Sequence, residues 1–301
     1  MFTLIGKTNI DFVGKRYIGF VISASLTALG VWSVFQIGGN RAKMAIDFSG
    51  GTSMQVRFEK PVTSEDLRGA LKADFPDAEI QQLGSGSEFI VKMRNLENQA
   101  GKTATRALEV LAKALPANKV SDSSSEEVGP AVSSKLRQQA ISAFFIGMLA
   151  ITIYIAFRFD FRFAVGAFVA TLHDVLAVMG IMVFLQRDFS LLIVTALLTL
   201  AGYSLTDTVV VFDRIRENMK LRRTDGFGKI VNDSINETLS RTINTSMTTV
   251  LTVIVLFFFG GPVIHDFSLA LIIGIAVGTY SSIFVASPVV VEWNLRQPPG
   301  R

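Results

Sequence analysis

Asp207 is an ionisable residue inside a stretch that is otherwise apolar enough to cross a membrane. The stretch covers residues 192–212, and a membrane-spanning helix needs about 20 residues at a rise of about 1.5 Å each. A charge near the centre of such a helix costs roughly 2.5–3.5 kcal/mol, so carboxylates there face other helices and mark ion or proton pathways. Asp207 therefore predicts a proton-transport site, with a purely structural hydrogen bond to a neighbouring helix as the alternative.

The helical face of Asp207 carries further polar residues. Tyr203 and Ser204 precede it by about one turn on the same face, and Arg214 follows it by about two turns. Arg241 begins another apolar run and is expected to enter the membrane from the side at which Asp207 lies. This arrangement predicts an ion pair between Asp207 and Arg241. Nearby hydrogen-bonding groups would come from Thr242, Asn244, Thr245 and Ser246.

His173 and Asp174 are neighbours near the middle of a third apolar run. Neither would be tolerated facing lipid. Adjacent helical residues point about 100° apart, so one can face the bundle centre while the other meets a flanking helix. Histidine exchanges protons near neutral pH, which suits a proton relay. A structural His–Asp pair that braces the helices is an equally open interpretation.

The composition predicts a multi-pass α-helical membrane protein. Half of the 301 residues are hydrophobic, and six runs reach membrane length. The runs cover residues 17–37, 140–157, 163–185, 192–212, 242–259 and 267–291. In the last run Gly274 and Gly278 form a small-residue face for close helix packing. Together with the inward polar groups, this face predicts packing against a homologous six-span partner.

The distribution of basic residues predicts the orientation of the spans. The loops 186–191 and 260–266 contain only Arg187, whereas the other short connections and both ends are basic. By the positive-inside rule, residues 1–16, 213–241 and 292–301 are cytoplasmic, and residues 227–239 form an amphipathic helix at the interface. The basic residues are Lys7, Lys15, Arg16, Arg158, Arg162, Arg214, Arg216, Lys220, Arg222, Arg223, Lys229, Arg296 and Arg301.

Residues 38–139 predict one small α+β domain of the ferredoxin-like kind, outside the cell membrane. A turn motif of Asp47, Gly50 and Gly51 breaks an extended stretch over 45–58, because the glycine pair allows a sharp turn. Thr63 and Asp66 are spaced as a capping box, which opens a helix. Two strands, 79–83 and 88–93, flank a hairpin over 84–86, a second helix covers 104–115, and a last strand covers 119–128.

Several classes of protein are excluded by composition. The sequence has no cysteine and two histidines, so disulfides, thiolate ligands and a histidine zinc site are not expected. No Ser/His/Asp, paired-Asp or metal motif has a placement suitable for catalysis, so we predict no enzyme and no catalytic or metal residues. The net charge of +4 reflects orientation in the membrane and not binding to nucleic acid.

Five segments together resemble the SecD/SecF family of bacterial protein translocase subunits, within the resistance-nodulation-division superfamily. They are IDFSGGT at 46–52, VGPAV at 128–132, HD at 173–174, GYSLTDTVVVFDRIREN at 202–218 and SRTINTS at 240–246. The fourth segment is the most specific. The resemblance is to the smaller, SecF-type member of the family and covers essentially the whole chain. It implies a subunit of the bacterial inner membrane with both termini in the cytoplasm.

The resemblance also implies a function and partners. It predicts that the chain acts with SecD to couple the proton-motive force to the passage of secreted proteins through the SecYEG channel. SecA, and YajC or YidC, would be further partners, unfolded exported polypeptides the cargo, and membrane lipids the surroundings. Asp207 and Arg241 resemble the family's proton-transport carboxylate and its basic partner. Protons are the coupling ion, and no other cofactor is implied.

Two other functions stay open at this point. Six spans with one external domain could be half of a proton-driven exporter of small molecules or lipids of the same superfamily. An apolar pocket in the external domain would favour that function, whereas a shallow open surface would favour unfolded chains. A purely structural membrane subunit is the other possibility, in which the intramembrane charges only join helices.

Overall fold

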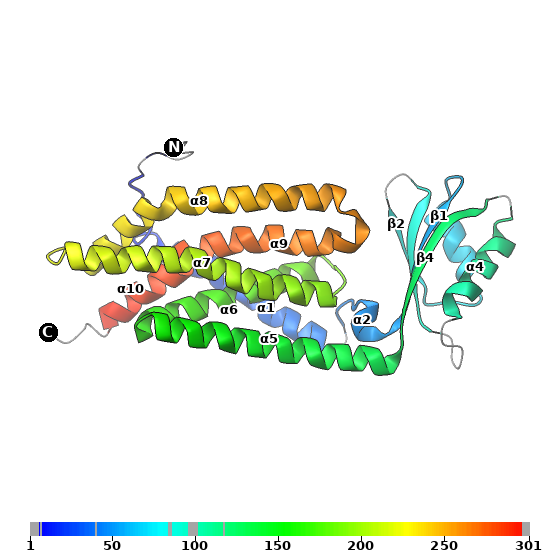
Figure 1. Cartoon of the computed structure of the whole chain (residues 1–301), viewed down its shortest axis with the longest axis horizontal. Helices are drawn as coiled ribbons and strands as arrows, with labels where there is room; N and C mark the ends of the chain where they lie inside the picture. Colours follow the sequence, from blue (N-terminus) through cyan, green and yellow to red (C-terminus); the bar gives the residue numbers. More distant parts are fainter. Residues whose placement is uncertain are drawn as a thin grey trace. The chain divides into compact units, whose positions relative to one another are not determined.

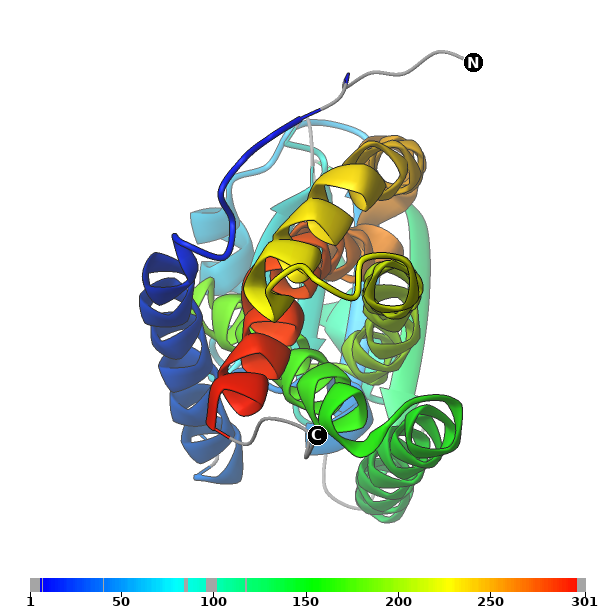
Figure 2. The same ribbon diagram turned by 90° about the vertical axis from the view of Figure 1, so that its left-hand side faces the viewer.

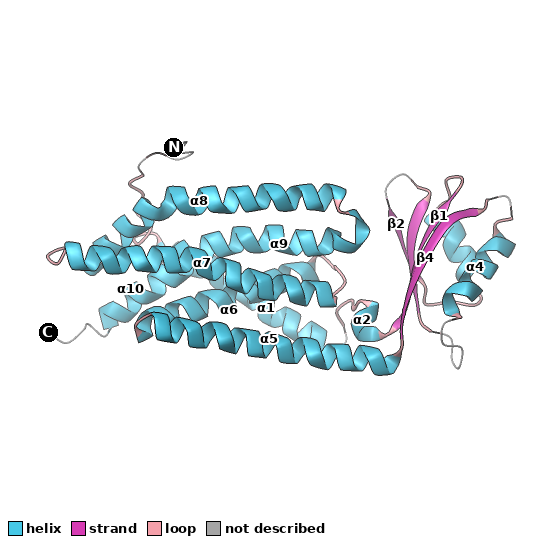
Figure 3. Cartoon of the chain, viewed as in Figure 1, coloured by secondary structure: helices cyan, strands magenta, loops and turns pink. Residues whose placement is uncertain are grey.

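The computed structural model describes residues 6, 8–39, 41–83, 86–95, 102–116 and 118–296. The chain divides into two compact units. The helical unit contains Met1–Lys43 and Ser142–Arg301, and the α+β unit contains Met44–Ile141. All strands of the described residues belong to the α+β unit, as the magenta arrows in Figure 3 show.

Six helical rods of the described residues are long and apolar enough to cross a membrane, which confirms the predicted multi-pass class (Figure 1). Five are single helices and the sixth has a π-helical turn, η1, within it. They are α1 (Arg16–Gly38), α5 (Pro130–Arg158), α6 (Phe161–Phe184), α7 (Leu191–Leu221), α8 (Phe227–Phe259), and α9 (Gly261–Ser281) continued by η1 (Ser282–Ala286) and α10 (Ser287–Arg296). Pro288 has no N–H to donate to the preceding turn, which accounts for the irregular turn at this place.

The six rods differ in how much of each is buried. Of the most apolar window, 61% is buried in α6 and 56% in α7, but only 17% in α5 and in α8. In the end-on view of Figure 2, α1 (blue) and α5 (green) lie at the periphery of the helical unit. The inner helices α6, α7 and α9 therefore form its core. The outer helices leave apolar faces for lipid or for another protein.

Close helix packing depends on glycines in two places. A Cβ atom on Gly30 of α1 would lie 2.4 Å from the backbone oxygen of Leu176 in α6, and one on Gly180 would lie 2.7 Å from the backbone nitrogen of Gly30. Gly274 and Gly278 of α9 pack against the side chains of Leu200 and Ser204 of α7, where added Cβ atoms would lie 2.1 Å and 3.0 Å from the nearest atoms. The expectation that this second glycine face contacts a partner bundle is therefore wrong, because it is used inside the chain.

Several helices are longer than the predicted spans. α5 begins at Pro130 instead of residue 140, and its 29 residues reach about 44 Å, more than the apolar thickness of a membrane. Residues 227–239 are helical as predicted, but they are the first turns of α8 and not a separate helix. They pack against the end of α7, where Arg222 forms ion pairs with Asp233 (2.8 Å) and Glu237 (2.7 Å).

The α+β unit has the ferredoxin-like order of strands and helices. Its sheet is antiparallel with the strand order β2-β3-β1-β4, and α3 and α4 pack on one face. The elements are α2 (Ile46–Ser49), β1 (Gly51–Phe58), α3 (Ser64–Leu71), β2 (Glu79–Leu83), β3 (Glu88–Met93), α4 (Thr103–Ala114) and β4 (Val120–Val128). The predicted capping box at Thr63 and Asp66 is present, whereas residues 84 and 85 of the predicted hairpin lie outside the described residues.

The Asp47, Gly50 and Gly51 motif forms a different structure from the predicted one. Residues 46–49 are a single helical turn, α2, with Asp47 in it, and not extended chain. Gly50 and Gly51 then adopt φ angles of +73° and +135°, which side chains rarely allow. A Cβ atom on Gly51 would also lie 2.8 Å from the backbone oxygen of Met93. The glycine pair thus reverses the chain from α2 into β1 within the sheet.

Candidate functional site

Asp207 lies near the middle of α7 and is buried where α7 meets α8 and α9. Its Oδ2 atom accepts a hydrogen bond of 3.4 Å from Ser246 of α8. The same Ser246 hydroxyl lies 2.7 Å from the hydroxyl of Thr279 in α9. Thr279 can itself donate to the Ile275 carbonyl at 2.8 Å, so the single Ser246 proton has two competing acceptors. We call Asp207, Ser246 and Thr279 the Asp207 cluster.

The sequence predicts that Arg241 forms an ion pair with Asp207. The structure places it on α8 within electrostatic range of Asp207, but not in direct contact. It is exposed, and the described residues offer its guanidinium no hydrogen bond or ion pair. The direct ion pair between Asp207 and Arg241 therefore stays a proposal.

The other residues predicted on the Asp207 face point elsewhere. The Tyr203 hydroxyl donates to Thr249 at 3.3 Å, and the Thr245 hydroxyl donates to the Arg241 carbonyl at 3.0 Å. Arg214 pairs with Glu237 of α8 at 2.5 Å. Within the described part of the chain, none of these side chains hydrogen-bonds to Asp207.

A second buried carboxylate, Asp174, is held by three side chains of different helices. His173 Nδ1 lies 2.9 Å from Oδ1, the Ser281 hydroxyl donates to Oδ2 at 2.7 Å, and the Ser204 hydroxyl donates to the same oxygen. His173 and Asp174 are only 4% and 1% exposed. We call these four residues the Asp174 cluster, and it joins α6, α7 and α9.

His173 and Asp174 contact each other, as expected for the structural His–Asp pair that was one of the two interpretations of the sequence. The histidine Nε2 atom is buried without a hydrogen-bond partner among the described residues. Thr279 and Ser281 were missed in the sequence, although the polar segment 278–282 in an apolar run was the signal that could have found them. Both clusters therefore share α7 and α9, about one helical turn apart.

Polar side chains also lie on the outside of the helical unit, on the segments of α7 and α8 that carry Asp207 and Ser246. Along α8, the residues Arg241, Thr245, Thr248 and Thr252 are exposed, as is Thr206 on α7. The threonine hydroxyls donate to carbonyls of their own helices, whereas the exposed Arg241 guanidinium has no hydrogen bond or ion pair among the described residues. A charge at membrane depth is expensive next to lipid. This face is thus suited to contact another protein.

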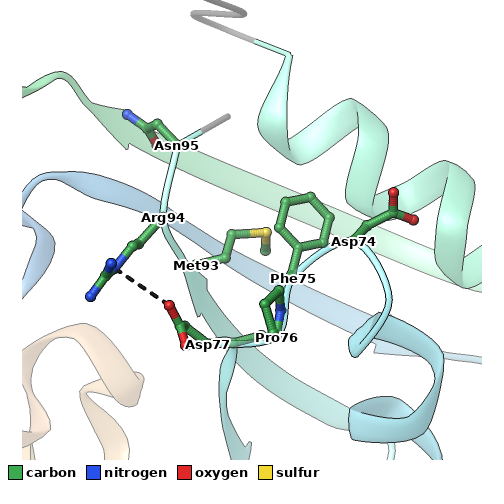
Figure 4. Close-up of a pocket in the computed structure, with 8 residues that line it drawn as sticks. Asp74, Phe75, Pro76, Asp77, Met93, Arg94 and Asn95 are labelled. Atoms are coloured by element: carbon green, nitrogen blue, oxygen red, sulfur yellow. Dashed lines mark ion pairs between the residues drawn. The ribbon is translucent and has the colours of Figure 1, made fainter. Parts of the chain in front are cut away.

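The structure offers no site for a resident metal ion in its described residues, which contain no group of three or more His, Cys, Asp or Glu side chains that could hold one. The α+β unit has a small hollow between the turn after α3 and the end of β3 (Figure 4). Its volume is about 220 Å³, below the usual range for small-molecule sites, and a pair of exposed side chains, Arg94 and Asp77, closes one side at 3.7 Å. Its lining mixes apolar side chains (Phe75, Pro76, Ala78 and Met93) with charged and polar ones (Asp74, Asp77, Arg94 and Asn95).

Two family models match the chain. The model described as protein export membrane protein SecD/SecF, C-terminal, covers residues 108–296, and the SecD/SecF GG motif covers residues 37–62. The second range contains the Gly50–Gly51 reversal, and the first contains both buried carboxylates.

Individual proteins agree with the family models over nearly the whole chain. The protein translocase subunit SecF of Thermodesulfovibrio yellowstonii is 48% identical over 97% of this chain and 97% of its own length. The crystal structure of SecDF from Thermus thermophilus, described as a translocon-associated membrane protein, has a TM-score of 0.83 and 41% identity, and covers 98% of this chain. This chain spans 40% of that structure's length, because SecDF is longer. The chain therefore belongs to the SecD/SecF family of protein export membrane proteins.

Proposed function

We propose that this chain works with SecD to couple the proton-motive force to the movement of secreted proteins through SecYEG. As a SecF-type protein it is a transport subunit and not an enzyme. The buried Asp207 cluster is the observation that carries the proposal. The alternative of a small-molecule or lipid exporter would need an apolar pocket of ordinary size, and the hollow described in the α+β unit is smaller, at about 220 Å³.

The Asp207 cluster has two hydrogen-bond arrangements that differ by one proton. When Asp207 is ionised, Ser246 donates to the carboxylate, and Arg241 is attracted to the negative charge. When Asp207 is protonated, its hydroxyl can donate to Ser246, which is then free to donate to Thr279 at 2.7 Å. Protonation thus reverses the hydrogen bond between α7 and α8, removes the charge that attracts Arg241, and leaves the Ser246 proton for the contact with α9. A two-state packing of these helices is the element that proton binding would bias.

The energy of one proton limits the mechanism. A charge that crosses 100 mV releases about 2.3 kcal/mol, whereas shifting a two-state protein from 1:99 to 99:1 needs about 5.5 kcal/mol. Each transport step therefore needs more than one proton, or a pH gradient in addition to the voltage.

His173 and Asp174 are proposed as a secondary part of the proton route. The Asp174 cluster is separated from Asp207 by one turn of α7, and the His173 Nε2 atom is buried without a hydrogen-bond partner among the described residues. Asp174 accepts three hydrogen bonds, whereas Asp207 accepts one. The Asp174 carboxylate is accordingly held more firmly, and Asp207 is the better candidate for the group that changes state.

Partnership with SecD follows from the homology to SecF and to the fused SecDF chain. The exposed Arg241, which has no ion pair among the described residues, and the exposed threonines of α8 support the proposal that SecD completes the proton route at this face. SecYEG, SecA, YajC or YidC, and unfolded exported polypeptides are the further partners proposed. The chain lies in the bacterial inner membrane, as its family implies.

Reconstitution tests the proposed function directly. Vesicles that contain SecYEG and SecA should export a secreted protein faster under an imposed proton gradient only when this chain and SecD are both present. The measurement is the amount of protease-protected secreted protein with and without the gradient. An equal increment in vesicles that lack this chain would refute the proposal.

A second prediction concerns orientation. We propose that both termini are cytoplasmic and that the α+β unit faces the opposite side, because basic residues are concentrated at the ends and in the 213–241 region. The chain has no native cysteine, so single cysteines can be placed at the exposed positions Lys72 and Thr224. An impermeant maleimide added from outside should label Lys72→Cys and not Thr224→Cys. The reverse pattern would invert the topology.

A further inference from the structure

The strand β4 forms a long edge of the sheet in the α+β unit. It lies at the end of the order β2-β3-β1-β4 and pairs with β1 from Gly51↔Val128 to Arg57↔Asp122. Among the described strands it has no second neighbour. An edge strand presents alternate N–H and C=O groups that can pair with another chain. With nine residues, β4 offers several such groups in a row.

The helical layer does not cover this edge. Ser125 lies opposite Met54 and Ser123 lies opposite Val56, so both serines point to the face that carries the core. Met54 and Val56 are fully buried, yet both serines are exposed. The layer of α3 and α4 therefore ends over β1, and residues 121–126 of β4 are exposed beyond it.

β4 lacks the proline and lysine that often protect an edge strand, and its charged side chains are all acidic. Residues 121–126 are all exposed, and the strand has no proline, lysine or arginine. Its register is irregular only near Phe58, at the start of the strand. The opposite edge, β2, has five residues and is flanked by α3. Short serine side chains occupy most of this exposed segment, and β4 is longer than β2, so of the two described edges β4 is the better suited to strand addition.

The side chains of β4 indicate what kind of chain it would accept. Residues 121–126 include no apolar side chain, whereas permanent subunit interfaces are rich in them. Asp122 and Glu126 give the strand a negative charge with no cation of its own. Arg57, opposite Asp122, is engaged with Glu88 at 3.3 Å. Transient pairing through the main chain with a segment that carries basic residues fits these features.

We propose that the outer edge of β4 binds an extended segment of the exported polypeptide as an added strand. The inference rests on the proposed function, since it names the surface at which cargo is held. Main-chain hydrogen bonds do not depend on the cargo sequence, which suits a subunit that must handle many different proteins. The acidic side chains favour segments with lysine or arginine and add little affinity, so release stays fast.

Cysteine cross-linking in the assembled complex tests this proposal. An exported protein with one cysteine in a lysine-rich segment is arrested during translocation in vesicles that contain this chain, SecD, SecYEG and SecA. Single cysteines replace residues 121–126 in turn, and Lys72→Cys, directly after α3, is the exposed control. We expect disulfides with the arrested protein from β4, with yields that alternate every second residue, and none from Lys72→Cys.

Two further variants separate backbone pairing from charge. Adjacent residues of an edge strand alternate in whether their N–H points to β1 or outwards. One of Ser123→Pro and Ser124→Pro should therefore abolish cross-linking from neighbouring cysteines in a folded protein. The other should weaken the α+β unit itself, seen as faster proteolysis. The double variant Asp122→Asn/Glu126→Gln should lower the yield roughly two- to fivefold.

The alternative outcomes are distinguishable. Cross-links from β4 to SecD instead of the arrested protein would overturn the proposal, because the edge would then be a subunit contact. Equal yields at all six positions would also overturn it, since a strand pairing requires alternation. Gradient-dependent export is measured in the same vesicles. If export responds to the gradient while β4 gives no cross-link to cargo, this inference fails and the proposed function stands.

Discussion

Asp207→Asn should abolish the gradient-dependent part of export while the chain still inserts, folds and binds SecD. Asparagine has nearly the same shape as aspartate and can still accept a hydrogen bond from Ser246. It cannot ionise, so Ser246 and Arg241 no longer meet a charge that appears and disappears with each proton. The helices α7 and α8 are then held in one packing. We expect the complete loss of the increment and an unchanged rate without the gradient.

The matched control is Asp213→Asn on the same helix. Asp213 lies nearly two turns further along α7, is partly exposed and pairs with Arg158 at 2.7 Å. An exposed ion pair contributes about 0–1 kcal/mol, so this change should leave export and its response to the gradient intact. Export is measured in vesicles with equal amounts of each variant. Full gradient dependence in Asp207→Asn vesicles would show that the carboxylate only joins helices.

The two buried carboxylates illustrate what sequence alone can and cannot resolve. Both were evident because an ionisable side chain in an apolar run is conspicuous. Their hydrogen-bond partners could not be predicted from the sequence. Helical spacing placed Ser204 on the Asp207 face, yet Ser204 donates to Asp174 of another helix. Spacing along one helix predicts the face on which a side chain lies. Which helix that face contacts depends on how α6, α7 and α9 cross.

The α+β unit was more predictable, because its signals are local. Alternation of apolar residues, the Thr63 capping box and turn residues specify strands and helices within short windows. The failure at residues 46–49 has a local cause as well. The apolar residues Ile46 and Phe48 alternate as in a strand, but the glycine pair after them reverses the chain and leaves room for only one helical turn.

The glycines of α1 and α6 lay beyond sequence reasoning for a different reason. Glycine occurs throughout the six spans, and only the structure distinguishes the ones that contact another backbone. Gly30 and Gly180 meet across the α1–α6 contact, whereas a Cβ atom on Gly202 of α7 would meet no atom within 4 Å. The same residue type therefore has opposite expected effects when it is replaced.

Gly30→Ala and Gly180→Ala should each destabilise the helical unit by roughly 1–3 kcal/mol, the usual cost of overpacking. Each new methyl group would lie within 3 Å of backbone atoms, which cannot rotate away as a side chain can, so α1 and α6 must separate. Gly202→Ala is the control, and it should be neutral or stabilise by up to about 1 kcal/mol, because alanine favours a helix over glycine. The measurement is the temperature at which half of the purified protein in detergent is lost from solution. Equal midpoints for all three variants would mean that α1 and α6 are not held together by backbone contact, and that the inner core of α6, α7 and α9 forms without α1.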